Sequence, residues 1–125
     1  MGKIRPEDSN TLTPVTLRYL NEKSRNTVAH INGNDGSLQS RIVLGYRDSL
    51  RVGIDNAKKE QYLPAELMTK LTVLKLRLES WDDQAPMPIQ GPIWYNVEQL
   101  PYREARNIAD EIIGICKEVS DLYGG

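Results

Sequence analysis

The chain has 125 residues, enough for one domain with a hydrophobic core, and its 39% hydrophobic and 26% charged residues are typical of globular proteins. The single cysteine, Cys116, and the single histidine, His30, exclude an intramolecular disulfide and a Cys/His zinc site within one chain. No apolar run approaches the roughly 18 residues that a membrane span needs. We therefore expect a cytoplasmic protein with no cofactor, no metal and no membrane partner.

The net charge of −1 selects no class of partner, but the charges are unevenly distributed. Residues 1–60 contain ten Lys or Arg and seven Asp or Glu, a balance of +3. Residues 61–125 contain six and ten, a balance of −4. This asymmetry either steers partners and favours head-to-tail self-association, or reflects ordinary variation on solvated faces.

The first part of the chain predicts a polar arm followed by a helix. Residues 1–12 are polar and form the arm, and residues 13–125 form a single helical domain. Thr13 and Pro14 provide a hydroxyl cap and a first helical residue that needs no N–H, so a helix over 14–31 is expected. Asn32-Gly33 is typical of a C-terminal cap and should end this helix.

The segment from 38 to 59 has two interpretations. As a helix it places one stripe on one face: Ile42, Gly45, Tyr46, Ser49, Leu50, Gly53, Ile54 and Ala57. The glycines of that stripe would let a neighbouring backbone approach closely. As strands, alternating apolar residues within 40–55 would form a hairpin. We favour a helix over 37–59, because the stripe continues for more than four turns although each glycine costs about 1 kcal/mol.

Two further helices are expected, separated by a proline-rich segment. Pro64 and Glu66 open a helix over 64–81, and Pro101 opens the last helix over 101–122. Three prolines and one glycine between them forbid a helix before Ile93. This segment is too apolar for a flexible linker, so it should pack on the domain, with Ile93 to Val97 extended, or bind a partner.

The predicted fold is therefore mostly α, with four helices in a single domain and an ordered proline-rich loop before the last helix. The alternative is an α+β fold with a small hairpin or sheet built from 40–55 and 92–98.

One short run pairs a cation with a group that titrates near neutral pH: Arg25, Asn26 and His30. A histidine can transfer a proton to or from a ribose oxygen, and an arginine can hold a phosphate through two parallel hydrogen bonds. Read as Arg-Asn-x-x-x-His, the run resembles the active-site motif of HEPN ribonucleases. The resemblance implies metal-independent RNA cleavage at a homodimer interface. Alternatively, Arg25 is a surface residue and His30 complements the helix dipole.

Two other sets of residues are candidate binding surfaces. Ile93, Trp94 and Tyr95 either cap the core of their own domain or form a contact surface, since large aromatics are enriched at interfaces. On the helix over 37–59, Arg47 and Arg51 share a face with Lys58 that either is simply solvated or binds a phosphate or nucleotide.

Because catalytic groups are scarce, we expect a non-enzymatic accessory protein for binding or assembly. It should be homo-oligomeric, with itself and another protein as partners, and should use residues 86–97 as its contact. One alternative is the HEPN-like ribonuclease that uses Arg25, Asn26 and His30. The other is a small-ligand or nucleotide binder, in which the face of Arg47 and Arg51 adjoins Trp94 and Tyr95; RNA would be a partner only under these alternatives.

Overall fold

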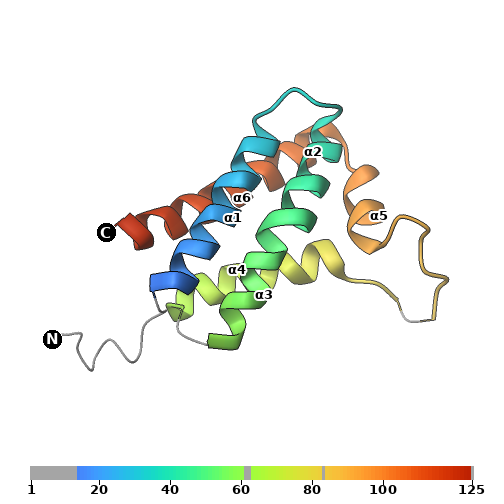
Figure 1. Cartoon of the computed structure of the whole chain (residues 1–125). Helices are drawn as coiled ribbons and strands as arrows, with labels where there is room; N and C mark the ends of the chain where they lie inside the picture. The colour runs from blue at the N-terminus through green and yellow to red at the C-terminus, as the bar shows by residue number, and fades with distance from the viewer. Residues whose placement is uncertain (1–13, 61–62, 83, 125) are drawn as a thin grey trace, which may run out of the picture.

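The computed structural model describes residues 14–60, 63–82 and 84–124, and within these ranges it contains helices and no strand (Figure 1). The elements in chain order are α1 (Pro14–Ile31), α2 (Leu38–Gly45), the π-helical turn η2 (Tyr46–Leu50), α3 (Arg51–Glu60), α4 (Ala65–Glu79), α5 (Pro92–Glu98) and α6 (Tyr102–Gly124). The mostly-α prediction is confirmed, and the hairpin or sheet from 40–55 and 92–98 is wrong. The N-terminal arm over 1–12 lies outside the described residues.

The segment with two interpretations is one continuous helix, made of α2, η2 and α3 in succession. Both residues that flank the η2 turn, Gly45 and Arg51, have right-handed helical dihedral angles. The N–H of Arg51 donates to the carbonyl of Tyr46, five residues back, and this spacing defines the π turn. The helix predicted over 37–59 is therefore confirmed, while the π turn inside it was not expected.

A short turn links α1 to α2. Helix α1 ends at Ile31, just before Asn32-Gly33, as predicted, and the positive φ of +77° in this turn occurs at Gly36. Ser37 then caps α2, because its hydroxyl accepts a hydrogen bond from the Ser40 N–H at 3.0 Å. Arg41 reaches back and donates to the carbonyl of Ile31, an acceptor at the end of α1, and to the carbonyl of Gly36 in the turn.

The residues 93–97, expected to be extended, instead lie within helix α5. Pro92 occupies one of the first helical positions, where its missing N–H costs nothing. The preceding residue, Gly91, has a φ of +88°, which turns the chain into the helix. The proline-rich segment is thus ordered before the last helix, as predicted, but the conformation expected for 93–97 was wrong.

α1 packs closely against the continuous α2–η2–α3 helix at two glycines. A Cβ added at Gly45 would lie 3.1 Å from the backbone oxygen of Thr27. A Cβ added at Gly53 would lie 3.0 Å from Cδ1 of Leu20. The Thr27 hydroxyl uses this proximity, since it lies 2.9 Å from the carbonyl oxygens of both Lys23 and Gly45. The glycines of the predicted stripe therefore serve close helix packing.

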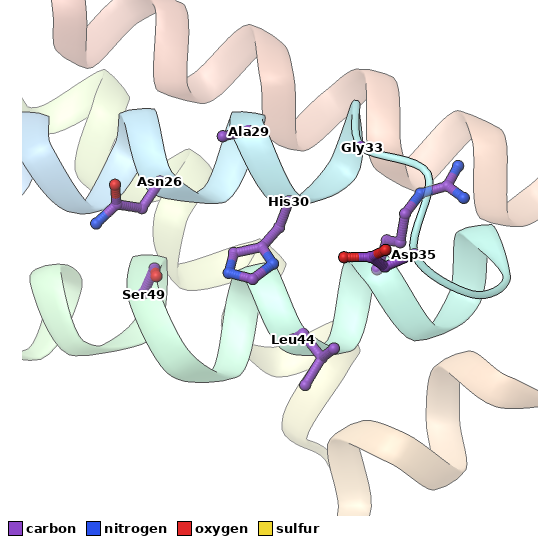
Figure 2. Close-up of a pocket in the computed structure, with 8 residues that line it drawn as sticks. Asn26, Ala29, His30, Gly33, Asp35, Leu44 and Ser49 are labelled. Atoms are coloured by element: carbon purple, nitrogen blue, oxygen red, sulfur yellow. The ribbon is translucent and has the colours of Figure 1, made fainter.

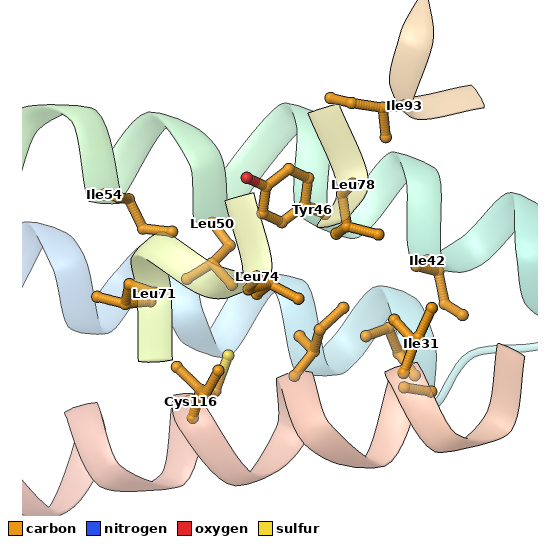
Figure 3. Packing of buried hydrophobic residues seen from close by; sticks show 14 of the residues in the cluster. Ile31, Ile42, Tyr46, Leu50, Ile54, Leu71, Leu74, Leu78, Ile93 and Cys116 are labelled. Atoms are coloured by element: carbon orange, nitrogen blue, oxygen red, sulfur yellow. The ribbon is translucent and has the colours of Figure 1, made fainter. Parts of the chain in front are cut away.

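The core lies between α1, the α2–η2–α3 helix, α4 and α6, and side chains from all of them point into it (Figure 3). Among the described residues, the largest fully buried side chain is that of Tyr46, which belongs to this cluster. Burying each such side chain contributes about 1.5–3 kcal/mol. Two ion pairs at the rim, Lys70–Glu118 and Arg77–Glu111, join α4 to α6. None of the helices in the described ranges is long and apolar enough to cross a membrane.

Candidate functional site

The loop between α4 and α5 is held to the bundle at its two ends. The side-chain amide of Asn96 donates to the carbonyls of Leu78 at 3.0 Å and Ser80 at 2.9 Å, and so fixes α5 against the end of α4. The rings of Trp81 and Tyr95 meet edge to face, with their centroids 5.0 Å apart. These contacts set the position from which the loop projects away from the helices (Figure 1).

The loop presents large apolar side chains to solvent. Met87 is 62% exposed and Ile89 is fully exposed, although an isoleucine normally favours the interior. Pro86 and Pro88 flank Met87, and proline restricts the backbone before any partner binds. Prior restriction lowers the conformational entropy that binding must overcome.

The three residues predicted as contacts, Ile93, Trp94 and Tyr95, point in different directions because they lie on a helix. Ile93 is buried, and Trp94 is partly buried against the core. Tyr95 keeps 46% of its surface exposed. The helix therefore turns two of these residues inward. Met87 and Ile89 lie within the predicted contact segment 86–97 but were not named as site residues, and they are the most exposed apolar side chains of that segment. Their position between prolines is the sequence signal that could have identified them.

The HEPN-like residues all lie on the exposed side of α1, in two adjoining pockets. His30 and Asn26 line a pocket of about 350 Å³ together with Asp35, Arg41 and Ser49. Figure 2 shows the His30 ring reaching from α1 toward α2 and the η2 turn. Arg25 lies outside this pocket and lines the neighbouring one of about 460 Å³, which also contains Asn26. Asn26 thus connects the two predicted catalytic side chains.

The residues that line the His30 pocket include the charged Asp35 and Arg41, and a further acid, Asp48, lies on the adjoining η2 turn. Asp48 accepts a hydrogen bond from Nε of Arg47 at 2.9 Å. This bond, with smaller contributions from the charges of His30 and Arg51, holds the pKa of the Asp48 carboxyl below its usual range.

The predicted basic face is occupied by carboxylates. Arg47 pairs with Asp48, and Nη1 of Arg51 lies 3.9 Å from Oε1 of Glu79. Glu79 also accepts hydrogen bonds from Lys75 at 3.1 Å and from the hydroxyl of Tyr46 at 2.6 Å. The charges of Arg47 and Arg51 are thus balanced by neighbouring acids, and the side chain of Lys58 lies outside the described residues.

A third surface was not predicted: a groove of about 490 Å³ between α1 and α6, called the α1–α6 groove below. It is lined by Ser24, Arg25, Val28, Ala29, Ile113, Cys116, Lys117 and Ser120. The Oγ atom of Ser24 is buried, and it lies in this groove together with Cys116. Two cations, Arg25 and Lys117, flank otherwise small or apolar walls, and no acid lines the groove.

Cys116 provides a pH-dependent test of this groove's packing. Burial raises the pKa of its thiol to about 12 from an ordinary 9.0. In the unfolded chain the thiol ionises near pH 9, while in the folded protein it stays neutral to about pH 12. Its contribution to stability is therefore complete below pH 9 and is lost as the pH rises from 9 to 12, at up to about 1.4 kcal/mol per pH unit.

We expect Cys116→Ala to lose less stability than the wild type between pH 9 and pH 12. Chemical unfolding at a series of pH values measures the difference, and Ser120→Ala, an exposed change in the same groove, is the control. If the stability of wild type and of Cys116→Ala depended equally on pH, the thiol would be shown to be solvated.

Comparison with known protein families, curated proteins and solved structures gave no match to this chain. Its function is therefore inferred from the three surfaces described above: the projecting loop, the His30 pocket and the α1–α6 groove.

Proposed function

We propose that this chain is a non-enzymatic binding and assembly protein of the cytoplasm, an accessory protein that self-associates through residues 86–97. The observation that carries the proposal is the exposure of Met87 and Ile89 on a proline-stiffened loop. Exposed apolar clusters on otherwise polar surfaces are characteristic of contact sites. The half-exposed Tyr95 extends the same segment, and tyrosine is enriched among residues that contribute strongly to interfaces. The single buried cysteine is in keeping with a reducing compartment.

The test is sedimentation velocity across a concentration series, comparing wild type with Met87→Ser/Ile89→Ser. We expect the wild type to associate and this loop variant to remain monomeric, because the loop loses its apolar surface. The matched control is Val52→Ser/Tyr102→Ser, which also removes two exposed apolar side chains, but from α3 and α6. A monomeric wild type, or a loop variant that associates as the wild type does, would refute the proposal.

A second function, metal-independent cleavage of RNA, is supported by the pocket that His30 shares with Asn26. In this mechanism His30 transfers the proton and Arg25 binds the scissile phosphate.

The test is cleavage of single-stranded RNA in the presence of a chelator. If the chain is this nuclease, His30→Ala should lose about 10²–10⁴-fold in rate. Asn34→Ala, an exposed change in the nearby turn, should leave cleavage unchanged. Failure of the wild type to cleave, or full activity in His30→Ala, would eliminate this function.

A further inference from the structure

The α1–α6 groove has the properties of a receptor for the projecting loop. Its walls include Val28, Ala29 and Ile113, which suit apolar side chains. Its volume of about 490 Å³ lies within the range of about 300–1,000 Å³ that is typical of ligand pockets. Met87, 62% exposed, and Ile89, fully exposed, are apolar side chains of the loop that such a site would cover.

The charges of the two surfaces are complementary. Residues 82–100 carry three acids, Asp82, Asp83 and Glu98, and no Lys or Arg. The groove presents Arg25 and Lys117 and no acid among its lining residues. Lys117 pairs with Asp121, four residues further along α6, and this highly exposed ion pair competes weakly with a partner. Complementary charges of this kind select partners and orient them.

The other apolar groove, between α4 and α6, has the wrong charge for this loop. It is lined by Glu111 and Glu118 with Lys70 as its one cation, and Lys70 is already bonded to Glu118 at 2.7 Å. Glu111 is likewise bonded to Arg77 at 2.6 Å, so among the described residues this groove offers an acidic loop no cation that is not already paired across the two helices. Charge therefore distinguishes two grooves that are similar in size and in apolar lining.

We propose that the loop of one copy docks, through Met87 and Ile89, into the α1–α6 groove of a second copy. This inference rests on the proposed function and names the partner and its receptor surface. Figure 1 shows the loop projecting from the side of the bundle opposite the C-terminal end of α6, so loop and groove are separate surfaces. A contact between two different surfaces is heterologous, and one molecule can offer both.

The experiment is complementation between two variants that each fail in one surface. The loop variant is Met87→Ser/Ile89→Ser, and the groove variant is Lys117→Glu/Ser120→Glu, two exposed positions on α6. Each variant alone should associate at least about 10-fold more weakly than wild type. An equimolar mixture should form a 1:1 dimer and nothing larger, because one intact loop meets one intact groove.

The matched control is Lys70→Glu/Val73→Glu, which places the same charges in the α4–α6 groove and should associate as the wild type does. Thermal unfolding of each variant establishes that it is folded. If the groove variant associates normally while the loop variant does not, the groove is wrong and the proposed function stands. If the loop variant also associates normally, both the proposed function and the docking of the loop in the groove are refuted. Two defective variants that remain monomeric when mixed would also overturn the pairing of loop with groove.

Discussion

Replacing Tyr46 with alanine is expected to lower the free energy of unfolding by about 3–5 kcal/mol, the range for truncating a large buried aromatic. Tyr46 is fully buried, and Figure 3 shows its ring within the core cluster, with Leu50 of the η2 turn and Leu78 of α4 beside it. Alanine would leave a cavity that four packed helices cannot close. Chemical denaturation at neutral pH measures the loss.

Two companion variants complete this test: one measures the contribution of the Tyr46 hydroxyl to stability, and the other is an exposed control. Tyr46→Phe keeps the ring and removes the 2.6 Å hydrogen bond to Oε2 of Glu79, which should cost about 1–2 kcal/mol. Tyr102→Ala removes a tyrosine that is 65% exposed, and it should change stability by less than about 0.5 kcal/mol. Equal losses in Tyr46→Ala and Tyr102→Ala would show that Tyr46 is not part of the core.

Burial, followed by the hydrogen bond to Glu79, also raises the pKa of the Tyr46 hydroxyl above its ordinary value of 10.0. The unfolded chain then releases this proton near pH 10 while the folded protein keeps it. The contribution of Tyr46 to stability is thus complete below pH 10 and declines as the pH rises further. Tyr46→Phe should remove this part of the alkaline decline.

Much of the fold could be predicted from the sequence because its signals are local. Pro14, Pro64 and Pro101 lie at or just before the starts of α1, α4 and α6, where proline tolerates the missing N–H. The apolar stripe over 42–57 identified the long central helix even though its glycines opposed it. Their cost is offset by tertiary packing on α1, which local propensity does not describe.

The features that were missed depend on contacts between distant residues. Nothing in the run Tyr46–Leu50 signals a π turn, and the Thr27 hydroxyl that bonds the carbonyl just before it comes from another helix. Helix α5 has only seven residues, too few for independent stability, and the Asn96 contacts with the end of α4 hold it.

The error at 93–97 shows how conformation determines which residues form a site. An extended segment would have placed Ile93, Tyr95 and Val97 on one face, because strand side chains alternate. The helix instead directs Ile93 and Val97, four residues apart, into the core and leaves Tyr95 outside. The apolar composition of the segment indicated that it matters for packing or binding, but the helical spacing determined which of its side chains are exposed to solvent.

The close contact between α1 and α2 predicts a second large effect, at Gly45. Gly45→Val should destabilise the protein by about 3 kcal/mol, at the upper end of typical overpacking costs. The added Cβ would lie 3.1 Å from the Thr27 backbone oxygen and 3.3 Å from Cβ of His30, and a backbone atom cannot rotate away. The two helices would have to separate, which would also displace His30 from its pocket.

The control for this change is Gly114→Ala in α6, where an added Cβ meets nothing within 4 Å. Alanine has a higher helix propensity than glycine, so this variant should gain about 0.5–1 kcal/mol. Thermal or chemical unfolding of both variants gives the comparison. If Gly45→Val lowers the free energy of unfolding and Gly114→Ala raises it, then close helix packing, and not helix propensity, requires glycine at position 45. A stabilised Gly45→Val would show that α1 and α2 are not in close contact, and the His30 pocket, which is built across the same helix crossing, would then lose its geometric basis.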